Sequence, residues 1–276
     1  MVRLNYHKNN DIKDDKKFVD FNLLKQCDDF DWIGFSPIID SYIGYNISLY
    51  VKGEKKRVIR NFSNFSEKHF YPSIGYAGSS NGGRGVKDKA FLEVFDLIAI
   101  RENAAKIMEG NIFAPVVVDG YGQDRNSDFL ISLMLPQLSD YTEKVARQEG
   151  LEIKESESQK WDIKLEKWVP FNVTVAKFPD DLVFRLIIPE GILTPELPYS
   201  ASDFIYHYCM QIDNYKLDKD NKYTQKTYNE MINQEYGSNH SFMLDRFKHM
   251  NDEQLLRYMN SRVANSKLNR DKHDKK

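Results

Sequence analysis

The sequence predicts an α+β protein with a helical N-terminal half, a small central β-sheet and a helical C-terminal region. Apolar residues recur at helical spacing in the first half of the chain and again after residue 203, and they alternate with period two between residues 151 and 189. We divide the chain accordingly into a flexible arm (1–17), an α+β core domain (18–198), a helical C-terminal region (199–266) and a basic, disordered tail (267–276).

Composition narrows the classes of protein. The 276 residues are 41% hydrophobic, which is ample for a buried core, and the net charge of -2 argues against a wholesale electrostatic nucleic-acid binder. No apolar run is long enough to cross a bilayer, and residues 1–17 are too polar for a secretory signal. We therefore expect a cytoplasmic protein without a membrane association, with Cys27 and Cys209 as reduced thiols.

In the N-terminal half, residues 18–22 alternate as a short strand does. The spacing of the apolar residues from Ile39 to Tyr50 predicts an amphipathic helix with Pro37 in its first turn. Residues 43–51 also fit period two, so the alternative is a strand that turns at Gly53. Helices are expected over 86–100 and 102–108.

Further along, the apolar run 114–118 is expected to be a strand that leads into a helix at 127–148, kinked at Pro136 and ended by Gly150. Residues 151–189 form the predicted sheet, with 182–188 as a buried strand. The remaining elements are four C-terminal helices, the first of them capped by Ser202: 203–215, 224–235, 240–250 and 252–263.

The stretch from residue 119 to residue 128 is the densest in chemically active groups. Asp119, Asp124 and Asp128 are candidate Mg²⁺ ligands and acid/base groups, because Mg²⁺ prefers carboxylate oxygens and water. Such a site would suit metal-assisted cleavage of a phosphodiester or phosphoanhydride. The architectural alternative is that Asp124 or Ser127 caps the helix and that Asp128 only complements its dipole.

The same stretch is a candidate phosphate site. A turn that carries Gly120 and Gly122 into a helix N-terminus resembles the way in which chains build anion sites, and Arg125 can clamp a phosphate with two hydrogen bonds. The alternative is that Arg125 pairs with a neighbouring side chain. The pattern is neither a dinucleotide fingerprint nor a P-loop, because the third glycine and the Gly-Lys-Ser/Thr step are both missing.

Two further segments carry candidate residues. Glu152 and Lys154, like Asp162 and Lys164, are an acid and a lysine two apart, the arrangement of PD-(D/E)XK nucleases, in which Lys154 would be an auxiliary catalytic cation. The alternative is the charged solvent face of an amphipathic strand. The glycine-rich loop 75–85 brings Arg84 as a candidate phosphate ligand, and the alternative there is a surface loop.

Residues 120–128, hereafter the central motif, resemble a Gly-x-Gly-x-Asp-Arg-x-Ser-Asp pattern of a poorly characterised bacterial family. Similar features flank it: Asp20 followed by Leu23 and Leu24, the Gly-Arg-Gly step at 83–85, and Pro-Phe-Asn at 170–172. The resemblance spans roughly residues 19–198. Gln123 and Asn126 depart from the pattern, in which proline and an aliphatic residue are usual.

The resemblance implies a bacterial protein associated with phage defence. With the candidate site, it leads us to predict a metal-dependent nucleic-acid-processing protein, a nuclease that uses Mg²⁺, whose partners are nucleic acid and other protein subunits. The alternative is a non-catalytic binding or sensor subunit of a multi-protein defence complex, in which the central motif is structural and the C-terminal helices form the interface.

Overall fold

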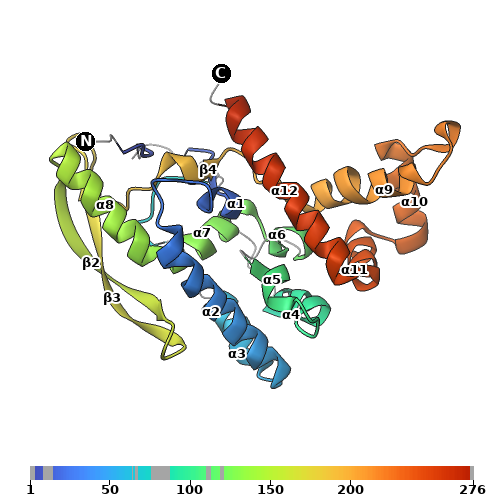
Figure 1. The fold of residues 1–276 in the computed structure, drawn as a ribbon, viewed down its shortest axis with the longest axis horizontal. Coiled ribbons are helices and arrows are strands. Elements are labelled where there is room, and N and C mark those ends of the chain that lie inside the picture. Colours follow the sequence, from blue (N-terminus) through green and yellow to red (C-terminus); the bar gives the residue numbers. More distant parts are fainter. Residues whose placement is uncertain are drawn as a thin grey trace.

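The computed structural model describes residues 4–8, 15–63, 65, 68–75, 88–109, 113–118 and 121–273, with residues 63, 88–91, 264–265 and 267–273 described by their backbone alone. The protein has an α+β fold in which small sheets lie between helical N- and C-terminal parts (Figure 1). The strands are β1 (Phe18–Val19), β2 (Glu152–Asp162), β3 (Lys167–Lys177) and β4 (Leu193–Thr194).

The helices of the first part surround the buried core of the protein. They are α1 (Phe21–Leu24), α2 (Trp32–Val51), α3 (Lys55–Ser63), α4 (Asp88–Ile98), α5 (Ala104–Met108), α6 (Ala114–Val117), α7 (Gln123–Leu133) and α8 (Leu135–Glu149). The C-terminal part holds the π-helical segment η3 (Asp203–Cys209), α9 (Met210–Tyr215), α10 (Gln225–Tyr236), α11 (Asn239–His249) and α12 (Asp252–His273). No helix among the described ranges is both long and apolar enough to cross a membrane.

Helix α2 begins earlier than its apolar spacing predicts. It starts at Trp32, because the side chain of Asp31 accepts a hydrogen bond from the Gly34 amide (3.0 Å) and so caps the helix. Pro37 therefore lies inside the helix and not in its first turn, so that prediction is wrong, and the helix lacks the hydrogen bond that an amide at this position would donate. The helix continues to Val51, so the alternative of a strand in its second half is wrong.

The expected helix 127–148 is instead two helices. α7 ends at Leu133 and α8 begins at Leu135, with Pro136 in the first turn of α8. Proline has no amide hydrogen and clashes with the preceding turn, which explains the break at Met134. Gly150 ends α8 as predicted, in a left-handed conformation with φ of 69°.

Two strand predictions are wrong. Residues 114–117 form helix α6, with a proline in its first turn, and not a strand. An apolar run of five residues does not distinguish a strand from a buried helix, so periodicity was insufficient there. Residues 182–188 form no extended strand, since only Arg185 pairs with β3 (through Ala176), and Leu182 is 86% exposed.

The predicted central sheet is an antiparallel hairpin of β2 and β3, which runs in register from the pair Glu152–Lys177 to the pair Asp162–Lys167. β3 packs against α8, and its Thr174 amide donates a hydrogen bond to the hydroxyl of Ser139 (2.9 Å). In Figure 1 the hairpin and α8 form one end of the molecule, opposite α9, α10 and α11. Near the hairpin turn, Trp161 packs edge-on against Tyr42 of α2.

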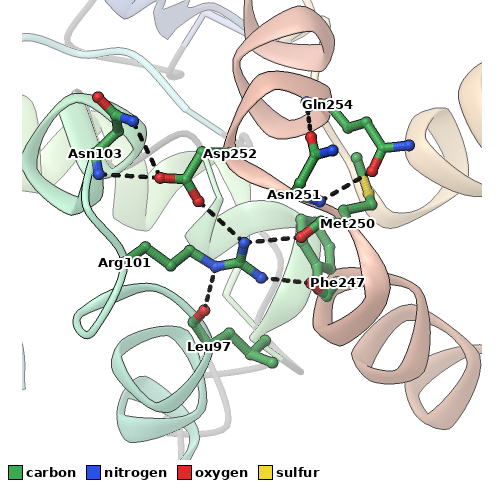
Figure 2. Close-up of polar contacts among 8 residues, drawn as sticks. All are labelled: Leu97, Arg101, Asn103, Phe247, Met250, Asn251, Asp252 and Gln254. Atoms are coloured by element: carbon green, nitrogen blue, oxygen red, sulfur yellow. Dashed lines mark hydrogen bonds and ion pairs between the residues drawn. The ribbon is translucent and has the colours of Figure 1, made fainter.

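The C-terminal helices join the rest of the protein through Arg101, which follows α4. Its guanidinium donates hydrogen bonds to the carbonyls of Leu97 (2.7 Å), Phe247 (2.9 Å) and Met250 (2.8 Å). It also pairs with Asp252 at the start of α12 (3.2 Å), whose carboxylate accepts the Asn103 amide (Figure 2). One partly buried cation thus satisfies the ends of α4 and α11 together.

The C-terminal end of α12 and the start of η3 both differ from what the sequence predicts. It continues to His273, into the segment predicted to be disordered, and its Arg262 pairs with Asp203 at the start of η3. Ser202 does not cap that segment, because it is itself helical; the hydroxyl of Ser200 accepts the Asp203 amide instead (3.1 Å).

We predict that Arg101→Ala lowers the free energy of unfolding by about 3 kcal/mol, because it leaves buried carbonyls without their charged donor. Urea unfolding followed by circular dichroism measures this change. The matched control is Arg57→Ala, which removes an exposed pair with Glu54 and should cost less than about 1 kcal/mol. Equal losses for the two variants would contradict the role given to Arg101.

Candidate functional site

The central motif lies where α6 gives way to α7, and it packs against β1. Its described part begins at Tyr121, which is 6% exposed and donates its hydroxyl hydrogen bond to the carbonyl of Arg125 (3.3 Å). Gly122 is the N-cap residue of α7. Asp119 and Gly120, predicted as metal and phosphate ligands, lie outside the described residues.

Two side chains of the motif hold distant segments of the chain together. The buried hydroxyl of Ser127 accepts a hydrogen bond from the Val19 amide (3.0 Å) and donates one to the carbonyl of Gln123 (3.2 Å). The side-chain oxygen of Gln123 accepts the amide of Leu197 (2.6 Å). The motif is therefore a junction between β1, α7 and the segment after β4, and Ser127 does not act as the helix cap.

Asp124 lies in the first turn of α7 and faces the start of the glycine-rich loop. A Cβ atom placed on Gly75 would lie 2.9 Å from the Asp124 carboxylate oxygen, and Gly75 has a φ of +130°. Only glycine permits both this backbone conformation and this close approach. The structure thus brings together two candidate segments that are far apart in the sequence. The rest of the loop, including Arg84, lies outside the described residues.

Arg125 differs from the other arginines that are at least partly buried. In the part of the chain that the structure describes, these are Arg101, Arg125, Arg185, Arg246 and Arg262. The guanidinium groups of the other four bond to carbonyls or carboxylates, whereas that of Arg125 makes neither a hydrogen bond nor an ion pair with a described residue. A half-buried cation is stabilised by a nearby negative charge, so this position is favourable for an anionic ligand.

Asp128 lies one helical turn after Asp124, so the two carboxylates share one face of α7. Its backbone carbonyl accepts a hydrogen bond from Ser132 (2.7 Å). No group of three or more histidine, cysteine or acidic side chains within the described ranges has the arrangement of a metal site. Of the three carboxylates predicted to bind Mg²⁺, the described ranges contain two, Asp124 and Asp128.

Lys154 is separate from the central motif. It lies on β2 with its ammonium 4.5 Å from the ring centre of Phe184, and its neighbour Glu152 pairs across the hairpin with Lys177 (3.7 Å). Asp162 accepts the amides of Lys164 and Leu165 at the hairpin turn (both 2.9 Å). Both acid–lysine pairs thus make contacts within the hairpin and its neighbouring segment, as the structural alternative expects.

The sequence did not predict a cluster of buried polar groups next to the central motif. Asp20 is fully buried, caps α1, and has one carboxylate oxygen without a hydrogen bond to any described residue. Burial raises the pKa of Asp20 to about 6, against the opposing effects of the Ser266 hydroxyl, the Asn22 amide and the Tyr199 hydroxyl. The sequence signal for this buried acid was the position of Asp20 between two apolar pairs, Phe18–Val19 before it and Leu23–Leu24 after it.

Asn126 belongs to the same interior. It is fully buried, and neither of its amide atoms makes a hydrogen bond with a described residue. A buried amide without partners is costly and therefore uncommon. An aliphatic side chain at this buried position would avoid that cost.

Comparison with known families gives one match. The model of DUF8370, a domain of unknown function, matches residues 5–200. The chain belongs to this family. The DUF8370 region includes β1, the central motif and the β2–β3 hairpin, and it ends before η3 begins at Asp203. No curated protein and no solved structure matches the chain.

We predict that Ser127→Ala lowers the free energy of unfolding by about 2 kcal/mol, because the buried Val19 amide loses its acceptor. Thermal and urea unfolding measure the loss. The control is Ser48→Ala, whose hydroxyl only donates to the Tyr45 carbonyl within its own helix, and we expect a change below about 1 kcal/mol. A Ser127 variant as stable as this control would contradict the role of a junction.

We also predict that Asp20 makes the protein less stable as the pH rises. Its folded-state pKa of about 6 exceeds the unfolded value, so its stabilising contribution is complete below about pH 4 and is lost as the pH rises through 6. The loss should approach about 3 kcal/mol at neutral pH. Urea unfolding of wild type and Asp20→Asn from pH 4 to pH 7 tests this. Parallel profiles for the two proteins would refute the assignment.

Proposed function

We propose that the protein is a non-catalytic binding subunit that holds a phosphate-bearing ligand, the backbone of a nucleic acid, at the N-terminal end of α7. The observation that carries the proposal is the half-buried Arg125 guanidinium, which no described residue neutralises. Arginine stays protonated at all physiological pH values, so the charge cannot be removed by titration. A phosphate, which matches the guanidinium fork with two hydrogen bonds, supplies the missing negative charge.

The surroundings of Arg125 support this reading. The N-terminal end of a helix carries a partial positive charge, which favours anions beside Gly122 and Arg125. Asp124 offsets part of that field, so Arg125 is the main positive charge at this end of the helix. Ser127 and Gln123 are occupied in holding the chain together and are therefore poor candidates for catalysis. The expectation of a phage-defence complex with other subunits rests on the resemblance of the motif alone.

The second candidate function is the Mg²⁺-dependent nuclease. It is favoured by the close approach of the Asp124 carboxylate to Gly75, because this contact joins an acidic site to a glycine-rich loop that can approach a ligand closely. In that function Asp119, Asp124 and Asp128 would hold Mg²⁺, and the ion would supply charge stabilisation at the phosphate. Asp124 and Asp128 share a helix face as that assignment requires.

We predict that the purified protein binds labelled single-stranded or duplex oligonucleotides and that its affinity falls with rising salt. Arg125→Ala should weaken binding at least about tenfold, the worth of a charge-assisted bidentate contact. Fluorescence anisotropy measures the affinity. The control is Arg147→Ala on α8, which removes an exposed arginine paired with Glu143.

The outcomes separate the two functions. No binding by the wild type, or equal weakening by Arg125→Ala and Arg147→Ala, would overturn the binding proposal. The same oligonucleotides are then incubated with Mg²⁺ and with Mn²⁺. Metal-dependent cleavage that Asp124→Ala abolishes would replace the binding subunit with the nuclease.

A further inference from the structure

A cavity of about 310 Å³ lies at the other end of α7, where α7 meets α8. It has three walls: the chain segment before Pro72, the α7–α8 junction with Ser132 and Leu135, and the β2–β3 hairpin. Its volume lies within the range of small-molecule sites. The cavity is distinct from the region around Arg125, because none of its lining residues belongs to the central motif. The lining residues are Phe65, Lys68, His69, Phe70, Tyr71, Ser132, Leu135, Glu157, Ser158, Gln159 and Trp168.

Aromatic rings make up much of the cavity wall. Trp168 packs edge-on against Phe65 with ring centres 5.9 Å apart, and Phe65 in turn packs against Phe129 of α7. Phe70 and Tyr71 are buried, and the Tyr71 hydroxyl is already bonded to Ser132 (2.7 Å). These rings are thus held in place by the core. A rigid aromatic wall favours a flat ring system, which stacks on it without ordering flexible side chains.

Four polar side chains around the cavity make no polar contact with another described residue. Glu157 and Gln159 stand two apart on β2, so both project from the hairpin face that also carries Trp168. Lys68 and His69 lie on the facing chain segment. None of these four side chains makes a hydrogen bond or an ion pair with another described residue. The cavity therefore presents an acceptor pair on one wall and positive charge on another.

We propose that this cavity binds a mononucleotide whose base carries an exocyclic amino group. The base stacks on the aromatic wall, and its amino group donates to the carboxylate of Glu157 and the amide oxygen of Gln159. The phosphate lies toward Lys68, which supplies the opposite charge, and toward the ring of His69, which can donate a hydrogen bond. This site does not depend on the proposed function, since it uses neither Arg125 nor the acids of α7.

Isothermal titration calorimetry of the full chain with AMP, CMP, UMP, adenosine and inorganic phosphate tests the proposal. We expect AMP and CMP to bind about tenfold more tightly than UMP, because uracil lacks the amino group. Adenosine should bind more weakly than AMP, and phosphate alone should not bind measurably. Glu157→Ala should remove the preference for AMP over UMP, and Lys68→Ala should weaken AMP binding about tenfold without changing that preference.

Both substituted side chains are exposed, so these variants should fold. The matched control is Glu155→Ala, two residues before Glu157 on the same face of β2 but outside the cavity lining, which should bind AMP as the wild type does. The absence of nucleotide binding at millimolar ligand would overturn the proposal. Equal affinity for phosphate and AMP, or equal losses in the Glu155 and Glu157 variants, would overturn it as well.

Discussion

The hydrogen bond from the Val19 amide to the Ser127 hydroxyl fixes the position of β1 against α7. Within the described ranges, β1 pairs with just the two residues of β4, so the sheet itself gives it little support. The bond to α7 supplies the missing acceptor inside the protein. Gln123, one turn earlier, receives the Leu197 amide in the same way. Two side chains of one helix thus determine where the beginning and the end of the DUF8370 region meet.

This arrangement divides the central motif between two tasks. Ser127 and Asn126 are buried in the interior, whereas Gln123, Asp124 and Arg125 are only partly buried and lie at its border. A helix turns by 100° per residue, so consecutive positions necessarily face both the core and the outside. The sequence of the central motif therefore does not by itself distinguish a catalytic loop from a structural joint.

Much of the fold could be predicted from local signals. Caps and apolar spacing locate α10 and α11 to within a residue or two, and alternation reveals the hairpin, because both signals depend only on neighbours in sequence. The apolar run 114–118 was misread because a short, fully buried segment has no polar face to show its period. The burial of Asp20 and the environment of Arg125 among the described residues depend on tertiary packing, which no local pattern reports.

The first and last helices of the described chain are joined by a buried hydrogen bond, in which the side-chain amide of Asn22 donates to the hydroxyl of Ser266, 244 residues later. α12 also packs on α1 and β4. Proteins are synthesised from the N-terminus, and early segments fold while later ones are still being made. During synthesis all residues of the DUF8370 region are therefore made before α12, the helix that packs on α1. The packing of α1 is completed only when α12 has been made. Contacts between residues so far apart in sequence slow folding and prolong the exposure of apolar surface to chaperones.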